Sequence, residues 1–201
     1  FRGPSPIPAA ILAGDTETGV TIQRLALKMD QGNILDQTRI PLQGTERTLD
    51  LIEPLGRLGA EGIIRVLTGL RQQSITEIPQ DHEAATYCRL IKKDDGRIAW
   101  EDDAQTIERK IRAYDPWPGA YSTYKGLQLL ITSAAAETVC DYSTDVTPGF
   151  VAGMDKKRGL CVMTGKGWLY ITRLKLQTKR EMNYKDFYNG NKDIINSTLG
   201  G

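Results

Sequence analysis

The stretch GLCVMTGKGWLYITRLKL, from Gly159 to Leu176, decides the fold of the second half of this chain. Two runs rich in apolar, β-branched and aromatic residues flank a short turn that contains glycine, a pattern typical of paired strands. Similar runs precede it at residues 120–124, 127–132 and 149–153. Five short strands with turn signals between them predict a small, mostly β, antiparallel barrel of the OB type.

The first half of the chain predicts a mixture of helix and strand. A short helix is expected over residues 5–13, with Ser5 as its N-cap, and strands are expected over 19–27 and 34–41. The turn between these strands contains Gly32, which can adopt a positive φ.

A long helix is expected to follow, with Thr48 as its N-cap. Apolar residues recur there at helical spacing, at Leu51, Leu55, Leu58, Gly62 and Val66, with Ile52, Ile63 and Leu67 beside them. Pro54 should bend this helix or move its start to a later residue. Asp103 and Asn183 are expected to cap two further helices.

Composition limits the class of protein. The chain has 201 residues, of which 40% are apolar and 25% charged, values typical of one or two globular domains. No apolar run approaches the roughly 18 residues of a membrane helix, so no membrane partner is expected. Three distant cysteines and a single histidine, His82, favour neither a disulfide framework nor a metal site. Residues 1–74 and 93–201 are interpreted as two domains, joined by a linker over 75–92.

The net charge of +1 hides a strong asymmetry along the chain. Residues 156–192 contain ten Lys or Arg against two Asp or Glu, whereas residues 94–155 contain five against eleven. A basic segment of this kind indicates a polyanionic partner or a solvated surface that pairs with its acidic neighbour, and charge alone leaves both open.

Several motifs, in a fixed order, carry a resemblance to a known family. They are RGPSPI from Arg2, GDTETGVTI from Gly14, ATY from Ala85, DGRIAW from Asp95, IRAY from Ile111, PWPGA from Pro116, LQ at 176–177, KREM at 179–182 and DFYNG from Asp186. The chain thereby resembles the central and C-terminal parts of methionyl-tRNA formyltransferases over most of its length. The resemblance implies an α/β remnant of a Rossmann-like formyltransferase domain, followed by an OB-like barrel domain that binds tRNA.

The resemblance also implies a reaction. In this family, 10-formyltetrahydrofolate donates a formyl group to the α-amine of methionyl initiator tRNA. The family's catalytic Asn and His and its folate-binding loop lie upstream of the first motif, so the chain is expected to be a fragment and inactive alone. The alternative is a non-catalytic RNA-binding module that retains the barrel.

The same resemblance assigns candidate residues in the first half. Asp30, in Asp30-Gln31-Gly32, matches the family's catalytic acid, although without the family it would be interpreted as a solvated turn residue. Arg2, Gly3 and Gly32 are the expected substrate-binding residues. Arg2-Gly3 fits equally well as the approach to the first helix.

Candidate tRNA-binding residues lie in the basic segment. They are Lys156, Lys157, Arg158, Arg173, Lys175, Lys179 and Arg180. Such side chains on an OB-like barrel can follow a phosphate backbone, and the other interpretation is an exposed, solubilising surface.

The turn around Asp30 contains a single acidic residue, as in mitochondrial members of the family. A mitochondrial matrix protein is therefore expected, with a bacterial-type cytoplasm as the alternative. The initiator tRNA is the expected partner of a monomer.

Overall fold

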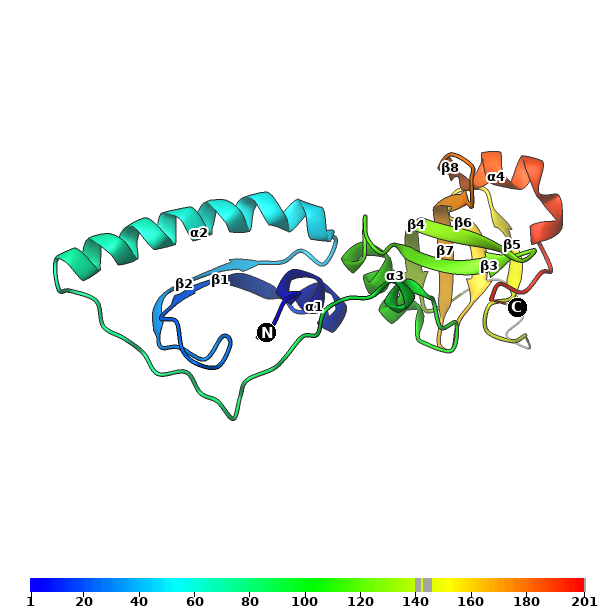
Figure 1. Cartoon of the computed structure of the whole chain (residues 1–201). Coiled ribbons are helices and arrows are strands. Elements are labelled where there is room, and N and C mark those ends of the chain that lie inside the picture. Colours follow the sequence, from blue (N-terminus) through cyan, green and yellow to red (C-terminus); the bar gives the residue numbers. More distant parts are fainter. Residues whose placement is uncertain (140–141, 143–145, 201) are drawn as a thin grey trace. The chain divides into compact units, whose positions relative to one another are not determined.

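The computed structural model describes residues 1–139, 142 and 146–200, and it contains two compact units. The first unit is Phe1–Ile91 and the second is Lys92–Gly201. Each is described by itself below (Figure 1).

In the first unit a long helix lies along a two-stranded sheet (Figure 1). Helix α1 (Pro6–Ala13) is followed by the antiparallel strands β1 (Glu17–Gln23) and β2 (Ile34–Pro41) and by helix α2 (Thr48–Arg71). After α2 the chain continues in a mostly extended form, and the backbone of Ile78 pairs with that of Ile34. The segment expected to be a linker is thus hydrogen-bonded to the first unit.

Strand β1 ends at Gln23, earlier than the expected residue 27. Its pairing with β2 stops at Gln23 opposite Ile34, and the chain between them forms a loop, residues 24–33, which carries Asp30. Leu25 and Leu27 are fully exposed in this loop, although their apolar character favoured a strand. The strand prediction was therefore wrong at this end.

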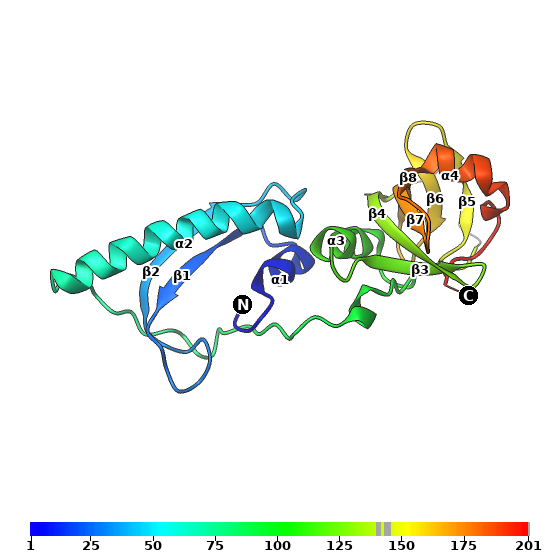
Figure 2. The same cartoon turned by 45° about the horizontal axis from the view of Figure 1, so that its top comes forward.

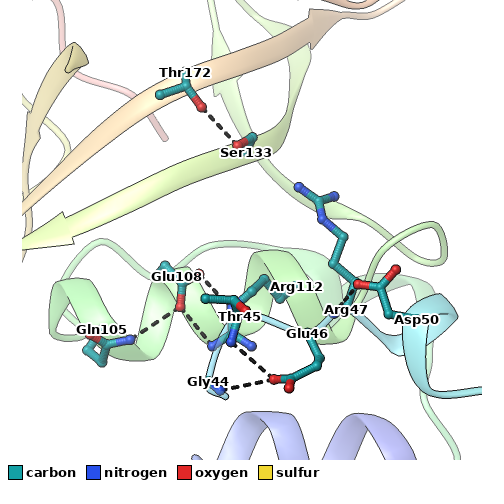
Figure 3. Close-up of polar contacts among 10 residues, drawn as sticks. All are labelled: Gly44, Thr45, Glu46, Arg47, Asp50, Gln105, Glu108, Arg112, Ser133 and Thr172. Atoms are coloured by element: carbon teal, nitrogen blue, oxygen red, sulfur yellow. Dashed lines mark hydrogen bonds and ion pairs between the residues drawn. The ribbon is translucent and has the colours of Figure 1, made fainter. Parts of the chain in front are cut away.

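Helix α2 begins one residue earlier than expected and is capped differently. Its N-cap is Arg47 rather than Thr48, and the Arg47 backbone N–H donates to the Asp50 carboxylate over 2.9 Å (Figure 3). The Glu46 carboxylate, just before it, accepts backbone N–H groups from Gly44 and Thr45 (Figure 3). These bonds satisfy donors at the start of the helix and in the preceding turn.

The apolar face of α2 divides into a buried stripe and an exposed one. Leu51, Leu55, Gly62 and Val66 are buried as expected, while Ile52, Ile63 and Leu67 are 42–59% exposed. The helix continues through Pro54, so the expected later start is wrong.

In the second unit a helix and a turn precede the sheet. Turn η1 (Lys93–Gly96) leads to helix α3 (Ala104–Ala113), which Asp103 caps by accepting the Thr106 backbone N–H over 2.9 Å. On α3 the Glu108 carboxylate pairs with Arg112 (Figure 3). The expected cap at Asp103 is confirmed.

The strands of the second unit form one antiparallel sheet. They are β3 (Ala120–Tyr124), β4 (Leu127–Glu137), β5 (Val151–Asp155), β6 (Gly159–Met163), β7 (Trp168–Leu176) and β8 (Met182–Asn183), followed by helix α4 (Tyr184–Gly190) and turn η2 (Lys192–Ile194). The order is β3-β4-β7-β6-β5, with β8 beside β7. Leu129, Leu160, Leu169 and Ile171 are fully buried in a core that α3 and α4 complete.

The five expected strands are all present, but a closed barrel is not confirmed. No strand pairing joins β3 to β5 in the part of the chain that the structure describes. The C-terminal segment lies between them instead, because Leu199 donates its N–H to Gly149 and Gly200 donates to Thr123. The sheet is also bonded along β4 and β7 by side chains, with Thr172 donating to Ser133 over 2.8 Å (Figure 3).

Candidate active site and basic surface

Asp30 occupies the loop between β1 and β2 and faces the start of the chain. Its carboxylate Oδ2 accepts the backbone N–H of Gly3 over 2.8 Å, and Oδ1 lies 3.3 Å from the donating Nε2 of Gln23. The side chain is half-buried, and its backbone has a φ of 57°. Since an ionised carboxylate can accept about four hydrogen bonds, these two leave capacity for a further donor.

Gly3 and Gly32 both lie at this site, and each must be glycine for a different steric reason. Gly3 has a φ of +111°, and a Cβ there would lie 2.2 Å from the carbonyl oxygen of Cys88. Gly32 does not have the expected positive φ, which Asp30 adopts instead. Gly32 is required because a Cβ would lie 1.8 Å from the carbonyl oxygen of Arg24.

Arg2 is buried and its guanidinium is held by protein groups. It is 7% exposed, and it donates to Gln80 Oε1 from Nε over 3.2 Å and from Nη2 over 2.7 Å. Nη1 donates to the Tyr87 hydroxyl over 3.0 Å, and Nη2 lies 2.9 Å from Nδ1 of His82. The arrangement therefore favours the interpretation of Arg2 as part of the scaffold before α1 over that of a free substrate-binding cation.

Three residues at this site were missed in the sequence. Gln80, His82 and Tyr87 come from the extended segment after α2, which has no hydrophobic period and was interpreted as a linker. The ATY motif contains Tyr87, so for this residue the resemblance carried a signal. Gln80 and His82 had none beyond their polar side chains.

The basic turn between β5 and β6 is built on Asp155. Its Oδ1 accepts the backbone N–H groups of Lys157 and Arg158 over 2.7 and 2.8 Å, and these bonds hold the pKa of Asp155 below its usual value. The Arg158 guanidinium pairs with Asp155 and lies 4.5 Å from the ring centroid of Tyr170. Arg158 thus packs onto the sheet, whereas Lys156 and Lys157 are exposed.

The remaining expected cations lie on β7 and in the turn after it. Lys175, Lys179 and Arg180 are exposed, while Arg173 pairs with Glu181, which raises the pKa of Arg173. Glu181 also accepts a hydrogen bond from Thr132.

Hydrogen bonds connect the two parts of this surface. Arg173 is paired with Asn183 across β7 and β8, and the next residue, Tyr184, donates its hydroxyl to the Lys156 carbonyl over 2.7 Å. The β5–β6 turn, β8 and the start of α4 therefore lie at one end of the second unit (Figure 2). We call Lys156, Lys157, Lys175, Lys179 and Arg180 the basic surface.

The described residues also limit other site types. Among them no three His, Cys, Asp or Glu side chains gather as a metal site would require. None of their helices has the length and apolar character needed to cross a bilayer. Among the described residues, Cys88 and Cys161 take part in no disulfide, and Cys140 lies outside the described residues.

Comparison with protein families assigns both halves of the chain. A family model described as formyl transferase matches residues 1–67, and one described as formyl transferase, C-terminal domain, matches residues 90–192. The chain belongs to the formyl transferase family. Between the matched ranges lies the segment that supplies Gln80, His82 and Tyr87.

Curated relatives of this chain carry a more specific name. The methionyl-tRNA formyltransferase of Treponema denticola is 41% identical over 97% of this chain, and that of Roseiflexus castenholzii is 41% identical over 100% of it. The chain spans 61% and 63% of the length of these two relatives.

Solved structures share the formyl transferase fold at lower identity. HypX from Aquifex aeolicus, in complex with tetrahydrofolic acid, matches 96% of this chain and 34% of its own length, with a TM-score of 0.66 and 22% identity. An N-formyltransferase from Helicobacter canadensis matches 90% of this chain and 62% of its own length, with a TM-score of 0.64 and 15% identity. At these identities the likeness supports the fold alone.

Proposed function

We propose that this protein transfers a formyl group from 10-formyltetrahydrofolate to the α-amine of methionine on the initiator tRNA. One observation carries the proposal: relatives named methionyl-tRNA formyltransferase are 41% identical over nearly the whole chain, both units included. The name of those relatives supplies the acceptor. The formyl transferase family and a neighbour that binds tetrahydrofolic acid favour a folate donor.

Asp30 would serve the proton transfers of this reaction. The amine must lose a proton as it attacks the formyl carbon, and the folate nitrogen must gain one as it leaves. A carboxylate fixed by the Gly3 N–H and by Gln23 can hold a positively charged group in place without rotating away. The carboxylate oxygens of Asp30 can accept a further hydrogen bond, from a protonated base or from the substrate ammonium.

The second unit would hold the tRNA. The basic surface presents exposed cations without carboxylate partners among the described residues. Such cations are suited to bind the phosphates of an RNA backbone. The OB-like closure expected from the sequence is part of this proposal, supported by the hydrogen bonds of Leu199 to Gly149, just before β5, and of Gly200 to Thr123 on β3.

A direct assay tests the proposed function. The protein as its gene encodes it, incubated with a labelled 10-formyl donor and methionyl initiator tRNA, should form N-formylmethionyl-tRNA. Methionyl elongator tRNA is the control acceptor. Binding of tRNA without any formyl transfer would instead support the non-catalytic RNA-binding module. The mitochondrial matrix stays a prediction that these relatives do not support.

A further inference from the structure

The side-chain amide of Gln80 connects Arg2 to the loop that carries Asp30. Its Oε1 accepts from Arg2, while its Nε2 donates over 2.6 Å to the Gly32 carbonyl and over 2.8 Å to Oε1 of Gln23. The Asp30 carbonyl lies 3.1 Å from the same nitrogen. Both halves of the amide are thus in use, one toward the start of the chain and one toward the loop.

The order of donors and acceptors in this network is fixed by its two ends. Arg2 can only donate, so the oxygen of Gln80 must face it and the NH₂ group must face the loop. Gln23 must then present its oxygen to Gln80, which leaves its own NH₂ group for the Asp30 carboxylate. An ionised carboxylate can only accept, so no other orientation of the two amides satisfies every contact.

We propose that Gln80 is a positioning residue for Asp30. Through the order Arg2, Gln80, Gln23, Asp30, the segment after α2 orients the Gln23 amide and thereby the carboxylate used in formyl transfer. The inference rests on the proposed function of Asp30. A purely structural role, in which Gln80 only ties the loop to the segment after α2, predicts different kinetics.

The substitution Gln80→Glu separates the two roles. Glutamate keeps the length of the side chain and the acceptor toward Arg2, but it has no N–H for Gln23 or for the Gly32 carbonyl. In the natural protein we expect kcat for formylation to fall about 10- to 100-fold, as for a misplaced reacting group, with KM for both substrates nearly unchanged. The matched control is Gln72→Glu, at an exposed position just after α2.

A double-mutant cycle tests whether the effect passes through Asp30. If it does, adding Gln80→Glu to Asp30→Asn should lower kcat little beyond the single Asp30→Asn variant. Independent, multiplying losses would overturn the proposal. Should Gln80→Glu fail to fold by circular dichroism, Gln23→Met breaks the same connection and leaves Gln80 on Arg2.

The outcomes distinguish the two proposals. A normal kcat in folded Gln80→Glu and Gln23→Met, with Asp30→Asn impaired, overturns the positioning role alone. A normal kcat in Asp30→Asn removes the role of Asp30 and with it this inference. A loss confined to thermal stability, with kcat and KM unchanged, assigns Gln80 to structure only and overturns the inference.

Discussion

Asp30 has a backbone conformation that few residues tolerate, and this determines which substitution can test its role. At a φ of 57°, asparagine is accommodated at least as readily as aspartate, whereas most other side chains add strain. Asp30→Asn therefore retains the loop and removes the charge. We expect formylation to slow by up to about 10⁴-fold, the loss seen when an aspartate that orients a catalytic base becomes asparagine. Steady-state kinetics would measure the loss of turnover, and a tRNA titration would show whether binding is retained. Near-normal turnover would support the interpretation of Asp30 as a solvated turn residue.

The Gly3 backbone offers a second test, of stability. Gly3→Ala must place a Cβ within 2.2 Å of the Cys88 carbonyl oxygen, which belongs to the backbone and cannot move without displacing the segment after α2. Gly44→Ala is the matched control, because Gly44 also has a positive φ, of +81°, but nothing lies within 4 Å of the added atom. Strain alone costs about 1–3 kcal/mol, so Gly3→Ala should lose clearly more than Gly44→Ala.

Native-state hydrogen exchange of the amides in α1 and α2 would measure this difference in the first unit. Equal losses in the two variants would show that the close approach at Gly3 costs nothing.

The sequence predicted part of this site. The positions of Asp30 and Gly3 follow from motifs, since each lies at a turn next to a recognisable helix or strand. Gln80 has no such signal, because a side-chain amide in an irregular segment carries no periodicity, and its partners are distant in sequence. The backbone conformation of Gly32 was predicted wrongly for a related reason: a close approach of two backbones cannot be seen in a turn motif.

At the scale of an element, helix α3 offers a test of pH dependence. The Thr106 side chain and then its backbone N–H donate to Asp103, and these bonds hold the pKa of that carboxyl below its usual value. A lowered folded-state pKa adds stability that is present above the unfolded value and is lost as the pH falls through the folded one. Asp103→Ala should thus cost about 1 kcal/mol at neutral pH, and this cost should shrink progressively as the pH falls below the ordinary pKa of an aspartate, about 3.9.

Asp103→Asn is the matched variant for this test, because asparagine caps a helix without titrating. Tryptophan fluorescence during urea unfolding reports the second unit specifically, since Trp100, Trp117 and Trp168 all belong to it. A cost of Asp103→Ala that stayed constant at low pH would contradict the electrostatic part of the argument.

Strand β4 shows where element prediction fails and why. The expected strand stopped at residue 132, yet β4 continues through Ala134, Ala135 and Ala136. Alanine favours helices and is depleted in strands. Pairing with β7, where these residues lie opposite Ile171, Tyr170 and Leu169, outweighs that local preference. Element types were therefore predictable, and the length of a strand that depends on its neighbour was not.

At the scale of the whole molecule, the basic surface predicts how tRNA binding depends on salt. Lys156, Lys157 and Lys175 are exposed, so replacing all three with alanine should leave the fold intact. Arg158 is left unchanged because its contacts with Asp155 and Tyr170 belong to the fold. Each lost phosphate contact should flatten the slope of log K against log salt by about 0.7 to 0.9.

The matched control is the double variant Lys92→Ala with Lys93→Ala, because both lysines are exposed but lie beside acidic residues. Titrations of initiator tRNA at several ionic strengths would measure the slope for the triple variant and for the control. An unchanged slope in the triple variant would show that the basic surface makes no phosphate contacts, and would support its interpretation as a solubilising surface.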